Sequence, residues 1–97
     1  MTLLEIKEML VNKMIDGMHI TFDNNTYGDD DRISIFGSGA NDELWMKQKA
    51  VMDDMVKTLT EDKFVISLNS IDVLQVDGRK SGTQSIILRR SKNETNI

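Results

Sequence analysis

The chain has 97 residues, of which 39% are hydrophobic and 29% charged; its formal net charge is −4, and it has no cysteine. This length fits one domain, and this composition excludes the disordered, collagen-like and coiled-coil classes. No apolar run approaches the roughly 20 residues that span a bilayer, the N-terminus lacks the positive charge of a signal peptide, and the absence of cysteine excludes disulfides and thiolate metal sites. We therefore expect a single cytoplasmic domain over residues 1–97 that is stabilised by packing alone.

The first predicted element is a helix that begins after Thr2. Thr2 and Glu5 have the spacing of a capping box, in which each side chain accepts a hydrogen bond from the backbone of the other residue. Apolar residues then recur every three or four positions as far as Gly17, which is typical of a helix end. The wide apolar stripe predicts a well-buried helix.

Two short strands follow. Apolar and polar residues alternate over residues 18–22 and again over residues 32–35, and the polar stretch 23–31 lies between them. This pattern predicts a hairpin with a long loop. The alternation also places His19 on the face opposite Met18, Ile20 and Phe22, so we expect an exposed histidine.

A second helix is predicted after a glycine-rich stretch. Residues 37–40 (GSGA) interrupt the second strand, and Asn41 or Asp42 is suited to cap the helix that follows. At helical spacing an arc of about 140° contains seven apolar residues: Leu44, Trp45, Val51, Met52, Met55, Val56 and Leu59. The glycines lack the lysine of a phosphate-binding P-loop, so we interpret them as a connector.

Three further strands are predicted after the second helix, over residues 64–68, 71–76 and 83–88, which are rich in isoleucine and valine. Residues 77–82 have the composition of a turn, so the last two strands form a hairpin. Residues 91–97 are polar and follow no period, and we expect a disordered tail there.

The predicted order of elements is αββαβββ. Because every link between consecutive strands is too short for a crossover, the strands must be mainly antiparallel. We therefore expect an α+β fold: a mainly antiparallel five-stranded sheet with two helices packed on it.

The charge is unevenly distributed along the chain. Residues 1–31 have a net charge of −5, residues 32–62 of −2 and residues 63–97 of +3. Net-negative proteins are poor general binders of nucleic acid, so a partner with a basic surface is favoured.

The long polar loop is the predicted partner contact. Adjacent carboxylates repel one another and gain nothing for folding, so their presence suits a basic partner. The loop also resembles part of a calcium-binding loop, but its twelfth position is not a glutamate and its flanks are predicted strands. An ordinary solvated loop is the other alternative. We predict that the contact is made by Asp23, Tyr27, Asp29, Asp30 and Asp31.

No set of catalytic residues is visible in the sequence. His19 is the only histidine and no serine is paired with it, so we expect no enzyme, no cofactor and no metal. The alternative function is a nucleic-acid-binding accessory protein that uses the basic C-terminal hairpin. The hairpin lacks aromatic residues for stacking on bases, so we expect weak or no direct binding of nucleic acid. Its bases are Arg79, Lys80, Arg89, Arg90 and Lys92.

One stretch of the C-terminal third, residues 80–89, reads KSGTQSIILR. This tenth of the chain resembles the C-terminal strand of small phage-encoded anti-CRISPR proteins that inhibit Cas9. The resemblance implies an inhibitor whose acidic side chains imitate the phosphates of DNA and occupy a basic groove. We therefore expect a small, non-enzymatic, macromolecule-binding inhibitor, monomeric or homodimeric, whose acidic side chains bind a basic, nucleic-acid-binding surface of a host protein.

Overall fold

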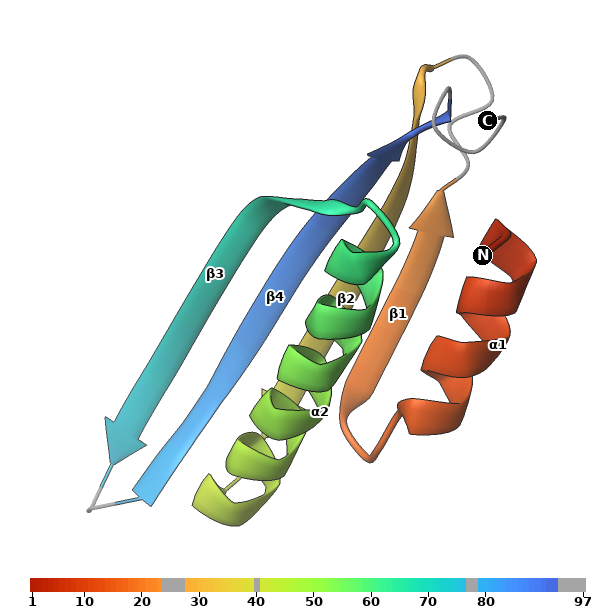
Figure 1. The fold of residues 1–97 in the computed structure, drawn as a ribbon. Helices are drawn as coiled ribbons and strands as arrows, with labels where there is room; N and C mark the ends of the chain where they lie inside the picture. Colours follow the sequence, from red (N-terminus) through yellow and green to blue (C-terminus); the bar gives the residue numbers. More distant parts are fainter. Residues whose placement is uncertain (24–27, 40, 77–78, 93–97) are drawn as a thin grey trace.

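The fold consists of two helices on one face of an antiparallel sheet (Figure 1). The computed structural model describes residues 1–23, 28–39, 41–76 and 79–92, with the backbone alone for residues 72–81. The strands are hydrogen-bonded in the order β1-β2-β4-β3. The elements are α1 (Leu3–Lys13), β1 (Met18–Asp23), β2 (Asp30–Gly39), α2 (Asp42–Glu61), β3 (Val65–Val76) and β4 (Arg79–Ser91).

The prediction of five strands in the order αββαβββ is wrong. Residues 65–68 and 71–76 belong to one strand, β3, so the described residues form a four-stranded sheet, and the order of elements is αββαββ. The sequence predicts a break at Asn69 and Ser70, yet they pair in register with Ile86 and Ser85 of β4. Polar side chains do not end an edge strand, because its backbone still pairs on one side and its side chains reach solvent.

The strands β2 and β4 are also longer than the alternation predicted. β2 begins at Asp30 and runs through the glycines to Gly39, and β4 begins at Arg79, within the predicted turn. Ser91 ends β4, and the backbone N–H of Lys92 donates to the carbonyl of Asp29 at 2.9 Å. The part of the predicted tail beyond Lys92 lies outside the described residues.

Helix α1 begins as its capping box predicted. The backbone N–H of Glu5 donates to the Thr2 hydroxyl at 3.2 Å, and the backbone N–H of Thr2 donates to the Glu5 carboxylate at 3.1 Å. The latter hydrogen bond stabilises the ionised carboxylate and so lowers the pKa of Glu5 below its ordinary value. The helix buries Ile6 and Leu10 on the inner side of its stripe.

The core lies between the helices and one face of the sheet. Every second residue of β2 is buried, as alternation requires of a strand with one covered face. We call the other face of the sheet the open face; it contains His19, Thr21 and Asp23 of β1 and the residues that pair with them across β2, β4 and β3. The described core residues are Ile6, Leu10, Met18, Ile33, Ile35, Met52, Met55, Leu59, Phe64, Ile86 and Leu88.

The turn between α1 and β1 depends on Gly17. Its φ is +78°, and a Cβ there would lie 2.4 Å from the carbonyl oxygen of Ser38 and 2.5 Å from Nε2 of Gln48. The buried Gln48 amide donates to the carbonyls of Asp16 and Ser38, at 2.7 and 3.0 Å. Helix α2, the turn and β2 therefore come so close together at residue 17 that no side chain fits there.

Replacing Gly17 by alanine is expected to destabilise the domain by about 2 kcal/mol, because the left-handed backbone and the crowded Cβ both oppose it. Thermal unfolding followed by circular dichroism measures the loss. Asp16→Ala is the matched control, since Asp16 is exposed and its backbone carbonyl is retained. Equal melting temperatures for the two variants would show that the turn does not require glycine.

Candidate functional site

The predicted acidic contact lies at the end of the sheet where β1 ends and β2 begins. Asp23 and Asp29 are exposed, whereas Asp31 is buried, with 8% of its surface accessible. Tyr27 lies outside the described residues. The carboxylate of Asp30 is 3.5 Å from Nε of Arg32 and 3.7 Å from Nη1 of Arg89.

The three consecutive aspartates do not form one acidic cluster. Asp30 and Asp31 are both in β2, and successive residues of a strand point to opposite faces. Asp30 therefore lies on the open face with the two arginines, and Asp31 lies on the side of the helices. Of the four predicted aspartates, only Asp23 and Asp29 present exposed side chains at this end of the sheet.

Arg90 has a structural environment that the sequence analysis missed. Only 4% of its surface is accessible, and its Nη1 donates to the Asp62 carboxylate at 2.7 Å and to the Met1 carbonyl at 3.0 Å. Its guanidinium also lies 4.6 Å from the centre of the Phe64 ring, a cation–π distance. Arg90 shares its position in the alternation with Ile86 and Leu88, and this parity could have predicted its burial.

The basic hairpin is therefore not a continuous basic surface in the described residues. Arg90 is held in the interior, and Arg89, on the open face, is paired with Asp30. Arg32, the neighbour of Arg89 in register, is paired with the same carboxylate. The side chains of Arg79 and Lys80 lie outside the described part of the chain.

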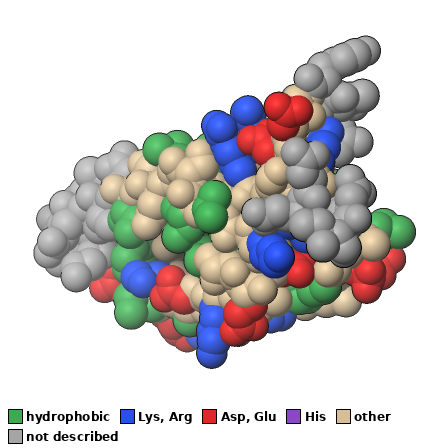
Figure 2. Space-filling model, turned by 45° about the horizontal axis from the view of Figure 1, so that its top comes forward, with side chains coloured by type: hydrophobic (Ala, Val, Ile, Leu, Met, Phe, Trp, Pro, Cys, Tyr) green, Lys and Arg blue, Asp and Glu red, His purple; other side chains and the backbone are tan. Residues whose placement is uncertain are grey.

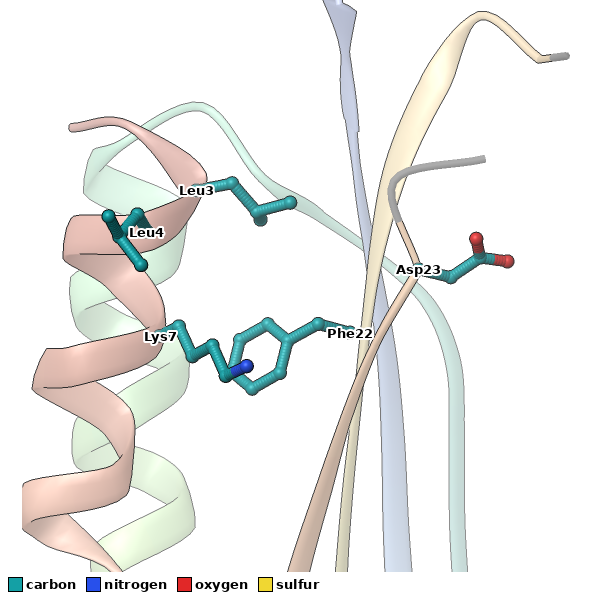
Figure 3. Close-up of a pocket in the computed structure, with 5 residues that line it drawn as sticks. All are labelled: Leu3, Leu4, Lys7, Phe22 and Asp23. Carbon is teal, nitrogen blue, oxygen red and sulfur yellow. The ribbon is translucent and has the colours of Figure 1, made fainter. Parts of the chain in front are cut away.

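A groove of about 390 Å³ lies between α1 and β1 (Figure 3). It is lined by Leu3, Leu4, Lys7, Phe22 and Asp23, and Nζ of Lys7 is 5.8 Å from the centre of the Phe22 ring. Figure 3 shows the Asp23 carboxylate pointing away from the other four side chains. The groove thus does not bring the Asp23 carboxylate and the Lys7 ammonium together. It is an apolar depression, with the ammonium of Lys7 over the Phe22 ring.

The other candidate sites of the sequence analysis have structural explanations. His19 is exposed on the open face, as alternation predicted. Gly39 lies in β2 rather than in a phosphate-binding loop, and a Cβ there would approach Cα of Trp45 to 2.7 Å. The glycine therefore lets helix α2 lie close to the sheet. In the described ranges no group of three or more His, Asp or Glu residues has a geometry that could hold a metal ion.

The face of the molecule that Figure 2 draws has side chains of both signs of charge. Figure 2 shows Lys and Arg side chains interspersed with Asp and Glu side chains, with hydrophobic side chains exposed between them. Neither α1 nor α2 has the length and apolar character needed to cross a bilayer. Comparison of the chain with protein-family models, with curated proteins and with solved structures finds no match.

Proposed function

We propose that this chain is a non-enzymatic protein that binds a partner protein with a basic surface through the carboxylates of Asp23 and Asp29. The observation that supports this proposal best is the shared position of the two exposed side chains. Asp23 is the last residue of β1 and Asp29 directly precedes β2, so antiparallel pairing brings them to the same end of the sheet.

The proposed contact consists of salt bridges between the carboxylates of Asp23 and Asp29 and basic side chains of the partner protein. Asp30 is paired with two arginines and Asp31 is buried, so the described residues at this end of the sheet do not form the row of regularly spaced negative charges that would imitate a nucleic acid. Arg32 lies beside Asp23 in register on the open face, and Arg89 is the next residue across the sheet. A partner that fits this pattern has its bases opposite Asp23 and Asp29 and avoids placing bases opposite the arginines.

The proposal has a narrower form, in which the bound surface is one that the partner uses for nucleic acid. The chain would then act as an inhibitor by occupying that surface. The resemblance of residues 80–89 to anti-CRISPR proteins supports this form. Direct binding of nucleic acid by the chain has less support, because Arg90 is buried and Arg89 and Arg32 are paired with Asp30.

The double variant Asp23→Asn/Asp29→Asn is expected to bind the partner at least about tenfold more weakly, since each lost interfacial charge pair contributes around 1 kcal/mol or more. Its stability should stay within about 0.5 kcal/mol of wild type, because both side chains are exposed. The partner is first captured from a lysate of the source cells or their host on immobilised wild-type chain. Its affinity for both proteins is then measured at low and at high salt.

The matched control is Asp53→Asn/Glu61→Gln, which removes the same charge from exposed positions of helix α2. It should bind as wild type does, and the affinity of the wild type should fall as salt rises. Equal affinities for wild type and the Asp23/Asp29 variant, or an equal loss for the control, would contradict the proposed contact.

A further inference from the structure

Strand β3 is a long edge strand with an unpaired outer side. In the described part of the chain this twelve-residue strand pairs with β4 alone, and it ends the sheet order β1-β2-β4-β3. The other edge strand, β1, has six residues and lies beside helix α1 (Figure 1). The backbone N–H and C=O groups along an edge are satisfied most fully by another strand.

Four apolar side chains in the first seven residues of β3 are exposed, two on each face of the sheet. The exposed fractions are 63% for Val65, 48% for Ile66, 50% for Leu68 and 52% for Ile71. Ile66 and Ile71 pair with Leu88 and Gln84 and so lie on the face of the helices, whereas Val65 and Leu68 lie on the open face. Helix α2 packs on β2 and β4, and Figure 1 shows β3 outside its cover.

This edge has few of the features that usually prevent strand addition. Natural edge strands are protected by lysine, by proline, by short length or by bulges. The sequence of β3 contains no lysine, arginine or proline, and residues 65–71 contain no charge at all. Its one irregularity in register lies between Ile66 and Leu68, so the pairing is regular from Leu68 onward.

We propose that β3 pairs antiparallel with β3 of a second copy of the chain across a two-fold axis, joining two four-stranded sheets into one. The uncharged stretch 65–71 offers no charge pattern with which to select a foreign strand. A second copy, by contrast, meets no like charge and supplies apolar side chains to both faces. The surface is separate from Asp23 and Asp29, so this inference does not depend on the proposed function.

The two-fold axis must coincide with a residue, because residues opposite each other in an antiparallel pair lie on the same face. An axis at Ile71 is close to the middle of β3 and overlaps almost its whole length. With this axis, Asp72 of one copy does not lie opposite Asp72 of the other. Asp72 is the only charged residue in the sequence of β3. We therefore place Ile71 of one copy opposite Ile71 of the other.

Single cysteines test this geometry directly, because the chain has none of its own. In the dimer two Ile71→Cys residues have Cβ atoms about 5 Å apart, whereas two Val65→Cys residues are separated by about 40 Å. Mild oxidation should cross-link Ile71→Cys at least about tenfold faster than Val65→Cys. The control is Val11→Cys, an exposed position on helix α1, which should not cross-link. Equal rates along β3, as parallel in-register stacking would give, overturn the proposal.

Sedimentation equilibrium gives an independent measure of association. Wild type is expected to dimerise reversibly with a Kd on the order of 10 μM, since one strand pair is a small interface. Leu68→Lys should weaken the dimer at least about tenfold, and Met46→Lys, on an exposed position of α2, should leave it unchanged. Asp23→Asn/Asp29→Asn should dimerise as wild type does.

Hydrogen exchange of residues 65–71 in the wild type keeps the proposal testable if the Leu68 variant does not fold. Amides on the outer side of β3 should become protected as protein concentration rises through the Kd. A wild type that stays monomeric at about 500 μM, or that binds only the strand of a different protein, overturns the inference.

Discussion

Replacing Met55 by lysine is expected to unfold the domain, with a loss of at least about 4 kcal/mol in the free energy of unfolding. Met55 is fully buried between helix α2 and the sheet, and the described core offers it no carboxylate partner. The loss combines the cavity left by the apolar side chain with the burial of an unpaired charge. Circular dichroism in increasing urea measures it.

Leu10→Asp should have a similar effect from helix α1, because Leu10 is also fully buried. Met46→Lys is the control for Met55→Lys, since Met46 lies on the same helix but is 57% exposed. We expect that control to remain within about 0.5 kcal/mol of wild type. If Met55→Lys melted as Met46→Lys does, the assignment of the buried face of α2 would be wrong.

Arg90→Ala is expected to destabilise the domain by about 3 kcal/mol. The change removes a buried guanidinium that pairs with the Asp62 carboxylate, donates to a backbone carbonyl and stacks over Phe64. Its loss takes from the Asp62 carboxylate one of its two cationic partners, the other being the N-terminal ammonium of Met1 at 3.2 Å, and leaves a space beside the aromatic ring. Chemical denaturation measures the difference from wild type.

The neighbouring variant Arg89→Ala separates burial from charge. Replacing Arg89 by alanine removes the same charge as Arg90→Ala does. Arg89, however, lies on the open face in a 3.7 Å ion pair with Asp30. Partly exposed ion pairs contribute little, so we expect a loss below about 1 kcal/mol. Equal losses for the two variants would show that Arg90 is not a structural residue.

The helices could be predicted because their signals are local. The capping box of Thr2 and Glu5 and the apolar stripe of α2 depend only on spacing along the chain, and both are confirmed. The strands were less predictable, since pairing partners lie far apart in sequence. Asn69 and Ser70 are polar, but their pairing with β4 keeps β3 continuous. The glycines of β2 suggested a break, whereas Gly39 is required by the close approach of Trp45.

In the candidate site, too, features that depend on local alternation were predictable, and features that depend on pairing between strands were not. Alternation could have separated Asp30 from Asp31 and identified Arg90 as buried, had β2 and β4 been extended to their observed ends. The ion pair between Asp30 and Arg89 was not predictable, because it joins two strands whose register no local pattern reveals. The assignment of Asp23 and Asp29 to a partner contact stays a prediction.

The most direct test of the proposed function is competition between duplex DNA and the immobilised chain for the captured partner at about 150 mM salt. If Asp23 and Asp29 occupy a basic, nucleic-acid-binding surface, excess DNA should release the partner from wild type, and the Asp23→Asn/Asp29→Asn variant should retain little partner to release. The account is contradicted if the partner stays bound in excess DNA, or if the chain itself binds the DNA with micromolar affinity that Arg32→Ala and Arg89→Ala abolish.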